Sequence, residues 1–205
     1  MKIIIFGASG KTGKLVVEKA LQEDYTVTAF VRDTAKLDIQ HNNLTIIQGE
    51  ATNEEAVKTA IAGHDAVISC LGSSSGLGKT TILHEMGKNI VNGMKANQVS
   101  RIVYMASAGV DKEIPGIAGK VMMKLLANVL EDHRNALNEI KSNNLIYTIA
   151  RPMGLTDKPF TGAYRETFTG VPGGSRTISR ADVADFIIRS LEDEKYLNQS
   201  VALAD

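Results

Sequence analysis

An α/β fold built on a doubly wound parallel sheet is predicted by three features of the sequence. Apolar runs of strand length alternate with longer segments of helical period along most of the chain. The first run, Ile3–Phe6, passes directly into a glycine-rich turn and then into an amphipathic segment. The 205 residues, 43% of them hydrophobic, suffice for one substantial core, so we expect a single domain over residues 1–205.

The predicted elements follow one another in strand–helix order. Each strand is an apolar run bounded by polar or turn-forming residues, and each helix carries apolar residues three and four positions apart. Consecutive parallel strands need crossover connections, so the helices should cover both faces of the sheet. The strands are expected at Ile3–Phe6, Val27–Val31, Leu44–Ile47, Ala66–Leu71, Arg101–Met105 and Leu145–Ala150, and the helices at Lys11–Glu23, Glu54–Ala62, Thr80–Asn97, Gly119–Ser142 and Arg180–Glu192.

Residues 151–178 depart from this alternation. They include three of the four prolines and five of the 18 glycines, which makes the segment too long and irregular for an ordinary connection. Ligands of open α/β sheets bind beyond the carboxyl ends of the strands, where this segment starts. We therefore expect it to form an acceptor-site loop, followed by a helix with Ser179 as N-cap and Asp182 in its first turn.

Three glycines spaced by three follow the first strand. Gly7 lets the chain turn off the strand, Gly10 leaves room for a phosphate, and Gly13 lets the helix pack close to the sheet. The helix N-terminus adds free N–H groups and the positive end of the helix dipole. The motif predicts a Rossmann-type dinucleotide site. Its expected cofactor-binding residues are Gly7, Ser9, Gly10, Lys11, Thr12 and Gly13.

The end of the second strand bears on the choice of cofactor. An NAD site normally places an acidic residue here for the ribose hydroxyls, but residues 28–32 contain none. Arg32, with Lys11 nearby in the glycine loop, suits the 2′-phosphate of NADP through charge-assisted hydrogen bonds. Asp33 offers the alternative of a local salt bridge to Arg32. The sequence thus favours NADP over NAD.

Later strand ends add positions to the predicted cofactor site, because parallel strands end at one edge of the sheet. Glu50 follows the third strand and can bring a carboxylate near the adenine. Cys70, the one cysteine, is expected to be a small buried residue without a redox role. The further expected cofactor contacts are Glu50, Ala51, Cys70, Leu71, Gly72, Ser107 and Pro152.

Ser107 is the candidate catalytic residue, because it places a hydroxyl at the carboxyl end of the fifth strand. In short-chain dehydrogenases a serine here works with a tyrosine four residues before a lysine. None of the five tyrosines has a lysine four residues later, and the predicted helix Gly119–Ser142 contains no tyrosine. Alcohol–ketone chemistry, which needs a proton donor at the carbonyl oxygen, is therefore not expected.

Segments along nearly the whole chain match one known family. They are Gly7–Gly13, Val31-Arg32-Asp33, Gly63–Ile68, Lys88–Val91, Asp132-His133, Thr161–Tyr164, Ile178-Ser179 and the helix around Asp182. Through them the chain resembles the atypical short-chain dehydrogenases, and within these the biliverdin-IXβ reductases, or NADPH-dependent flavin reductases. The resemblance implies hydride transfer from NADPH to a planar acceptor such as a flavin, a quinone or a linear tetrapyrrole.

On this resemblance Ser107 holds the nicotinamide amide or the acceptor, and Pro152 with Met153 forms the wall of the substrate site. Tyr164 either stacks on the acceptor or anchors the long loop, and Met153 is otherwise a core residue. A flavin accepts hydride without a protein acid, which fits the missing tyrosine. The family carries a histidine where this chain has Met153 and an arginine where it has residues 73–76, so flavin is favoured over tetrapyrrole.

The alternative function is an NmrA-like regulatory protein that senses NADP without catalysis. Such a sensor should expose an apolar docking patch and turn over nothing. A sugar-nucleotide epimerase is a weaker third hypothesis, because these enzymes normally use the absent tyrosine.

Composition limits the partners. Lys plus Arg and Asp plus Glu both number 23, which gives no reason to expect a nucleic-acid partner. Neither a membrane-spanning stretch nor a secretory signal is recognisable, and no metal site is expected. The prediction is a cytoplasmic monomer or weak homodimer that acts on a small molecule.

Overall fold

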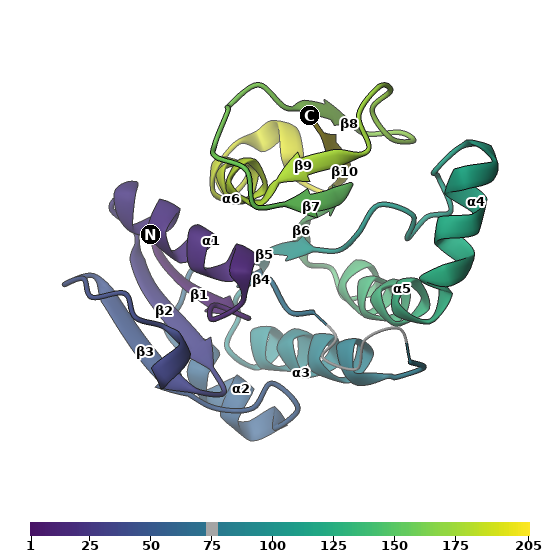
Figure 1. Cartoon of the computed structure of the whole chain (residues 1–205). Coiled ribbons are helices and arrows are strands. Elements are labelled where there is room, and N and C mark those ends of the chain that lie inside the picture. Colours follow the sequence, from purple (N-terminus) through teal and green to yellow (C-terminus); the bar gives the residue numbers. More distant parts are fainter. Residues whose placement is uncertain (73–77) are drawn as a thin grey trace.

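The structure is a computed structural model that describes residues 1–72 and 78–205 (Figure 1). The sequence also predicts a loop over the nicotinamide end at Gly72–Lys79. Residues 73–77 of this loop, and with them the position of the family's arginine, lie outside the described residues. The strands are β1 Lys2–Phe6, β2 Thr26–Val31, β3 Leu44–Gln48, β4 Ala66–Ser69, β5 Arg101–Met105, β6 Ile146–Pro152, β7 Gly154–Thr156, β8 Arg165–Thr167, β9 Thr177–Ser179 and β10 Gln199–Ala204. The helices are α1 Lys11–Gln22, α2 Glu54–Ile61, α3 Ile82–Ala96, α4 Gly116–Leu125, α5 Ala127–Ser142 and α6 Arg180–Arg189, with short 3₁₀ turns η1 Thr34–Lys36 and η2 Glu194–Tyr196.

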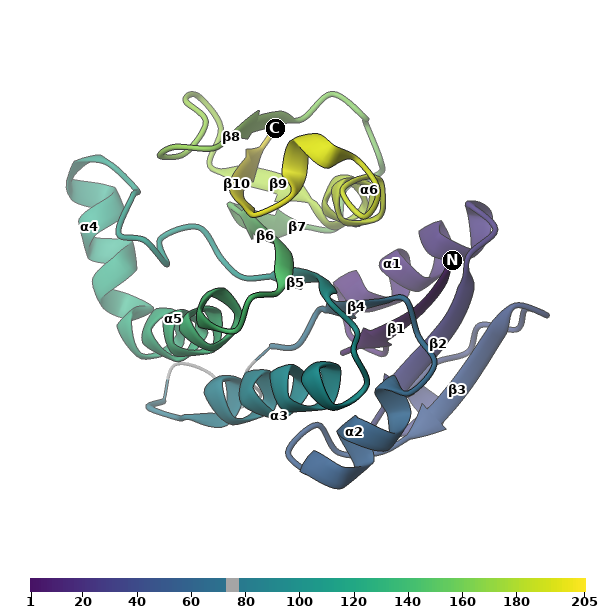
Figure 2. The ribbon, with the colours of Figure 1, turned by 180° about the vertical axis from the view of Figure 1, so that it is seen from behind.

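An eight-stranded sheet runs through the molecule in the order β3-β2-β1-β4-β5-β6-β10-β8. Its neighbouring strands are parallel except for β10 and β8, which are antiparallel. Helices α1 and α6 cover one face, and α2, α3 and α5 cover the other (Figures 1 and 2). The predicted doubly wound α/β fold is confirmed.

The pattern of β1 shows why its apolar run is continuous. Ile3 and Ile5 pack into the cluster beneath α1 and α6, whereas Ile4 and Phe6 pack into the cluster beneath α2, α3 and α5. All four side chains are fully buried, because successive residues of a strand point to opposite faces and both faces are covered.

The prediction of one helix over Gly119–Ser142 is wrong. The chain forms two helices, and Leu126 between them has φ −92° and ψ 8°. Helix α5 lies against α3, while α4 leaves that layer at a steep angle (Figure 1). The bend preserves helical hydrogen bonding, since Leu126 N–H donates to the Met122 carbonyl at 3.0 Å and Leu130 N–H donates to the Leu126 carbonyl at 2.9 Å.

The prediction that residues 151–178 are irregular throughout is wrong in part. They contain β7, β8 and β9, which have three residues each and are therefore too short to show a periodic pattern. Strand β7 pairs with β9 in a small parallel sheet, and β8 joins the edge of the main sheet. Strand β10, which the sequence analysis did not include, pairs parallel with β6 after the α6 crossover.

Candidate cofactor cleft and its surroundings

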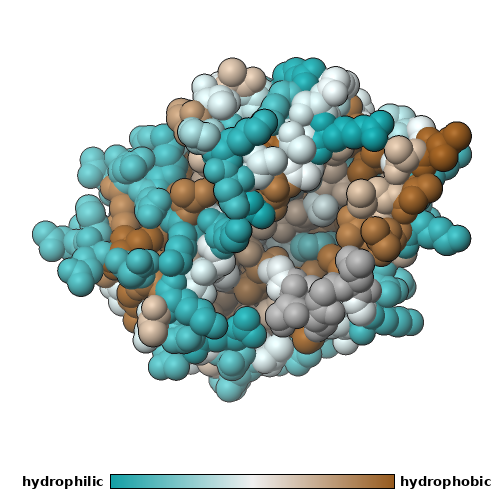
Figure 3. All heavy atoms as spheres, viewed as in Figure 1, coloured by the Kyte–Doolittle hydropathy of each residue, from teal (hydrophilic) through white to brown (hydrophobic). Residues whose placement is uncertain are grey.

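The strand order of the sheet reverses between β1 and β4, because β1 leads on to β2 and β4 leads on to β5. A cavity of about 700 Å³ opens at the carboxyl ends of these strands, within the usual size range of small-molecule sites. A hollow is visible on this side of the molecule in Figure 3. Predicted cofactor residues that line the cavity are Gly7, Ser9, Gly10, Lys11, Thr12, Gly13, Arg32, Glu50, Ala51, Cys70, Leu71 and Gly72.

The glycine turn leaves no room for side chains at two of its positions. Gly7 has φ +76°, and a Cβ there would lie 2.6 Å from the Cys70 carbonyl oxygen at the end of β4. A Cβ on Gly13 would lie 2.1 Å from the Gly7 carbonyl oxygen. The first glycine therefore allows the turn beside β4, and the third allows α1 to start directly against it.

Helix α1 presents an uncapped N-terminus to the cavity. Its N-cap Gly10 provides no side-chain cap, and its first turn carries no acidic residue. Its first N–H groups and the positive end of its dipole therefore face the cavity that Gly10, Lys11, Thr12 and Gly13 line. This arrangement suits an anionic group such as a phosphate.

Two cations mark the end of the cavity at β2. Arg32 and Lys36 both line it. The Asp33 carboxylate accepts a hydrogen bond from the Ala35 N–H at 3.1 Å and lies 3.8 Å from Lys36 Nζ. Among the ion pairs of the described chain there is none between Arg32 and Asp33. The Arg32 guanidinium is thus available to an anionic ligand, and the local salt bridge considered for it does not form.

Two buried side chains, Asn89 and Cys70, lie at the wall of the cavity that the turn after β3 and the end of β4 form. The buried Asn89 side chain on α3 donates to the Ala51 carbonyl at 3.0 Å and fixes the turn after β3. Burial raises the pKa of the Cys70 thiol to about 12. The thiol therefore stays neutral at physiological pH, as a structural rather than a redox cysteine would.

The N-terminus of α3, where Ile82 and Met86 line the cavity, is fixed from α5. The buried Asp132 carboxylate accepts the N–H groups of Leu83 at 3.1 Å and His84 at 2.9 Å. Asp132, the first residue of the family-matching segment Asp132-His133, therefore caps the N-terminus of α3.

His133 has a buried partner of its own. Its Nδ1 lies 3.0 Å from Tyr104 Oη, and burial lowers the pKa of the His133 ring to about 4. The ring is therefore neutral at physiological pH. It belongs to the sheet face beneath α3 and α5, where Tyr104 also lies, and not to the cavity lining of the described chain.

Ser107 lies just beyond the cavity rather than in its lining. Met105 at the end of β5 lines the cavity, and the chain continues extended because Ala106 N–H and Ala108 N–H donate to the Ala150 and Pro152 carbonyls at 2.8 and 2.9 Å. The alternation of a strand therefore puts Ser107 on the same side as Met105. Its Oγ donates to the Ala108 carbonyl at 3.1 Å.

The three remaining predicted residues are not brought to the cavity lining that the described chain forms. Pro152 is buried within β6. Met153 packs with Ala108 and Ala204 in a small apolar cluster, as its core alternative implied. The Tyr164 hydroxyl donates to Asp185 and accepts from Arg189, both at 2.9 Å on α6, which is the contact of a loop anchor.

A buried carboxylate clasps the loop that contains Tyr164. Asp182 is fully buried and accepts the N–H groups of Thr161 and Gly162, both at 2.9 Å, and the Ser179 hydroxyl at 2.7 Å. Burial would raise the pKa of the Asp182 carboxyl, but these hydrogen bonds outweigh it and lower the pKa. Thr161, Gly162, Ser179 and Asp182 thus form one clasp between the loop and α6.

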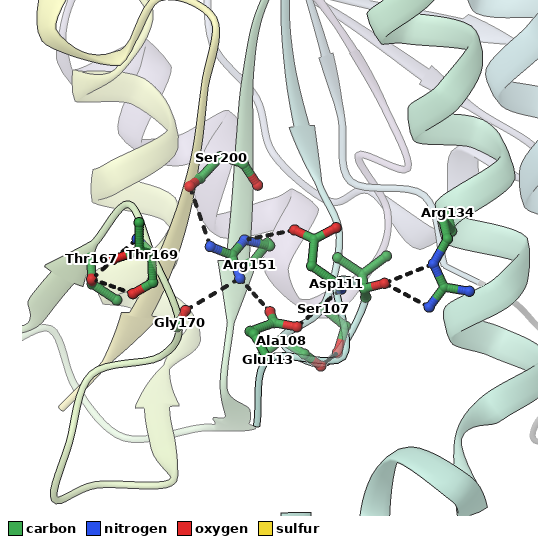
Figure 4. A network of polar contacts seen from close by, with 11 residues as sticks. Ser107, Ala108, Asp111, Glu113, Arg134, Arg151, Thr167, Thr169, Gly170 and Ser200 are labelled. Carbon is green, nitrogen blue, oxygen red and sulfur yellow. Dashed lines mark hydrogen bonds and ion pairs between the residues drawn. The ribbon is translucent and has the colours of Figure 1, made fainter. Parts of the chain in front are cut away.

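A second polar network lies beyond the end of β5 (Figure 4). The buried Arg151 forms an ion pair with Glu113 and also lies near the carbonyls of Gly170 and Ser200, at 3.4 and 3.3 Å. On the other side, Arg134 donates to the Val110 carbonyl at 2.9 and 2.7 Å. The two arginines hold the segment after Ser107 between β6 and α5.

Several lining residues were not predicted from the sequence. Lys36 stands four residues after Arg32, a spacing that a search for a second cation could have found. Met105 could have been found from its place two residues before Ser107. Phe30, Val31, Gly49 and Thr52 adjoin predicted residues in the sequence. Ile82, Met86 and Arg180 come from distant elements and carry no local signal.

The fold and the cleft define a dinucleotide-binding α/β protein of the Rossmann type. The model of the NAD(P)H-binding family matches residues 7–194, and the chain belongs to that family. No helix of the described chain is both long and apolar enough to span a bilayer.

The chain is also similar to individual proteins over most of its length. An uncharacterized chloroplastic protein of Arabidopsis thaliana is 29% identical over 95% of this chain and 73% of its own length. An uncharacterized sugar epimerase of Bacillus subtilis is 28% identical over 100% of this chain and 94% of its own.

Solved structures share the whole architecture. A Rossmann-fold NAD(P)-binding family protein of Shigella flexneri has TM-score 0.80 and 26% identity over 100% of this chain and 93% of its own. A short-chain dehydrogenase/reductase of Veillonella parvula in complex with NADP has TM-score 0.83 and 22% identity over 100% and 94%. An anaerobilin reductase of Escherichia coli O157:H7 has TM-score 0.82 and 21% identity over 100% and 97%. These likenesses show the Rossmann-type fold of the chain.

Proposed function

We propose that the protein is an NADPH-dependent reductase that transfers hydride to a planar, largely apolar acceptor, such as a flavin or a quinone. The observation that carries the proposal is the course of the cavity. It starts at Arg32 and Lys36, passes over the glycine turn, and reaches Leu71 and Met105. A dinucleotide lying along it has its 2′-phosphate at the two cations and its nicotinamide beside Met105.

The residues present fit this cofactor. The charged side chains among the described residues that line the cavity are four cations, Lys11, Arg32, Lys36 and Arg180, and one carboxylate, Glu50, which suits a polyanionic ligand. Bound NADPH would supply the hydride. The protein's proposed task is to bind and orient the two reactants. We assign to Ser107, which lies just beyond the cavity on the same side as Met105, the role of holding the nicotinamide amide or the acceptor.

The described lining offers neither a tyrosine nor a histidine as proton donor, and its carboxylate, Glu50, lies just after β3, which favours an acceptor that needs no protein acid. The two lysines of the described lining belong to the glycine loop and the β2 end. Flavins and quinones can take their proton from water after hydride transfer. A ketone would need a donor at its oxygen.

An exposed apolar surface lies beside the hollow. Ile117, Val121, Met122 and Leu125 of α4 are exposed by 84, 63, 49 and 58%. In Figure 3 hydrophobic atoms gather at the right-hand rim of the hollow, where Figure 1 places α4. This surface suits an apolar acceptor, but it is also the apolar patch expected of an NADP-sensing protein, so it does not separate the two hypotheses. The same fold in an anaerobilin reductase and in a dehydrogenase bound to NADP agrees with the proposal by analogy.

The test is NADPH oxidation with riboflavin, FMN and a quinone as acceptors, alongside NADPH binding by calorimetry. Turnover with any of them is the expected result, and the acceptor with the highest kcat/KM defines the class. Tight NADPH binding without turnover would contradict the reductase and favour the NADP-sensing regulatory protein. Failure to bind NADPH would contradict both.

A further inference from the structure

A single carboxylate bridges two cations of the cleft. Lys11 Nζ at the start of α1 lies 2.9 Å from Asp157 Oδ2, and Arg180 at the start of α6 forms an ion pair with Oδ1 of the same side chain. Lys11 and Arg180 both line the cavity, whereas Asp157, just after β7, does not belong to its described lining. The bridge therefore joins the cofactor loop to the segment that follows β6.

The cations of the cavity form two pairs. Arg32 and Lys36 stand together at the end of β2. Lys11, which was expected beside Arg32 at the 2′-phosphate, is instead held with Arg180 by Asp157 beside the uncapped N-terminus of α1. NADPH likewise carries its negative charge in two places, the 2′-phosphate and the pyrophosphate. The pair beside the helix N-terminus matches the pyrophosphate, because glycine-turn N–H groups bind that group.

We propose that Arg180 together with Lys11 binds the pyrophosphate of the cofactor, and that Asp157 occupies both cations in the free protein and must be displaced when the cofactor binds. This inference rests on the proposed function, since it assigns a subsite of the same cleft. The side chains of Lys11 and Asp157 are 71 and 63% exposed. The Lys11–Asp157 pair is therefore weak. The Arg180 side chain is 19% exposed, but its partner Asp157 faces solvent, so a pyrophosphate can displace this single carboxylate from both cations.

Displacement of Asp157 would couple the cofactor site to the loop of residues 151–178. Asp157 lies four residues before Thr161, where the Asp182 clasp holds the loop. Its release would alter only the contacts of the chain between β7 and that clasp. Cofactor binding would thereby change the partners of the acceptor loop without opening its anchor.

The experiment compares Kd values for NADPH and NADH, measured by calorimetry, in the wild-type protein and in Asp157→Asn, Arg180→Ala and Arg180→Lys. Removing the competing carboxylate in Asp157→Asn should tighten both cofactors by about 2–5-fold. Arg180→Ala should weaken both by about 3–10-fold, and Arg180→Lys by less, because it keeps the charge without the guanidinium fork.

Asp38→Asn is the matched control. The exposed Asp38 carboxylate accepts a hydrogen bond at 2.9 Å from Lys14, which lies on α1 as Lys11 does. Asp38 does not line the cavity in the described chain. It removes the same charge and should leave both Kd values unchanged. Thermal unfolding shows whether each variant is folded. If Arg180→Ala does not fold, the role of Arg180 is tested with Arg180→Lys alone.

The outcomes separate the two proposals. An unchanged or weaker affinity in Asp157→Asn overturns the competition, and an unchanged affinity in the folded arginine variants overturns the role of Arg180. A loss confined to NADPH would move Arg180 to the 2′-phosphate and overturn the pyrophosphate assignment. If the wild-type protein binds no NADPH, the proposed function itself fails.

Discussion

The cofactor loop and the loop of residues 151–178, which we propose to serve the acceptor, lie at the same edge of the sheet but are built by different contacts. The loop of residues 7–13 is shaped within itself and by β4, since Gly7 and Gly13 leave room only for backbone. The acceptor loop of residues 151–178 is held by partners far along the chain, including Asp182 for Thr161 and Glu113 for Arg151. A local motif can be read from sequence, whereas a clasp between distant residues cannot.

The comparison also changes the meaning of the motifs. The glycine motif lines the cavity, as its predicted function requires. The segments Thr161–Tyr164 and Ile178-Ser179 instead supply the Asp182 clasp and the Tyr164 anchor. A motif that is particular to a family can therefore record how a loop is folded rather than which group reacts.

The largest expected effect is in the cofactor loop. In Gly13→Ala the new Cβ would lie 2.1 Å from the Gly7 carbonyl oxygen, so the start of α1 must shift. We expect destabilisation of about 3 kcal/mol and loss of measurable NADPH binding. Urea unfolding and calorimetry give the two values. Gly173→Ala, where a Cβ has no neighbour within 4 Å, is the control, and equal effects of both changes would contradict this account.

The second effect concerns the clasp. Asp182→Asn replaces a buried carboxylate that accepts from two N–H groups and the hydroxyls of Ser179 and Thr161, and should destabilise the protein by about 2 kcal/mol. Cleavage between residues 157 and 164 in limited proteolysis should become faster. Asp193→Asn, at the exposed turn η2, is the control and should change neither. Unaltered proteolysis in Asp182→Asn would show that the clasp does not hold the loop.

The same clasp gives a pH dependence. The pKa of Asp182 is lowered in the folded protein, so its contribution is complete above the pKa of an unfolded aspartate, about 3.9, and is lost as the pH falls through the lower folded value. The difference in unfolding free energy between the wild-type protein and Asp182→Asn should therefore shrink on acidification below about pH 4. Urea titrations at a series of pH values measure it. A difference that grows on acidification would contradict the assignment.

The third prediction concerns cofactor choice. Arg32→Ala should weaken the binding of NADPH by about 1–3 kcal/mol and the binding of NADH far less, because only NADPH carries the 2′-phosphate. Calorimetry with both cofactors measures the selectivity. Lys14→Ala, a cation of α1 outside the described cavity lining, serves as the control. Equal losses for both cofactors in Arg32→Ala would remove the argument for NADP.

The smallest effect separates the two interpretations of Tyr164. Tyr164→Phe keeps the ring but removes the hydroxyl that contacts Asp185 and Arg189. As a loop anchor it should cost about 1 kcal/mol of stability and leave the acceptor KM unchanged. Tyr164→Ala distinguishes further, since loss of a stacking ring would raise the acceptor KM at constant NADPH affinity. A raised KM would restore Tyr164 to the acceptor site.

Much of the cofactor site could be predicted from the sequence, because the steric and charge requirements that define it involve residues close together in the chain. The strand of Ile3–Phe6, the glycine turn and the cation Arg32 lie within one short stretch, and each has a steric or charge reason to be there. Arg180 could not be found in this way, because only the crossover through α6 brings it to the cleft. The bend at Leu126 was missed because helical periodicity continues through it.

The most direct test of the reductase assignment follows the hydride itself. The protein is incubated with riboflavin and NADPH that carries deuterium on one face of nicotinamide C4, and in a second experiment on the other face. The deuterium content of the NADP formed is measured by mass spectrometry. A defined cleft predicts that NADP forms and that deuterium is lost with one label and retained with the other. Absence of NADP, or partial loss with both labels, would contradict hydride transfer in this cleft.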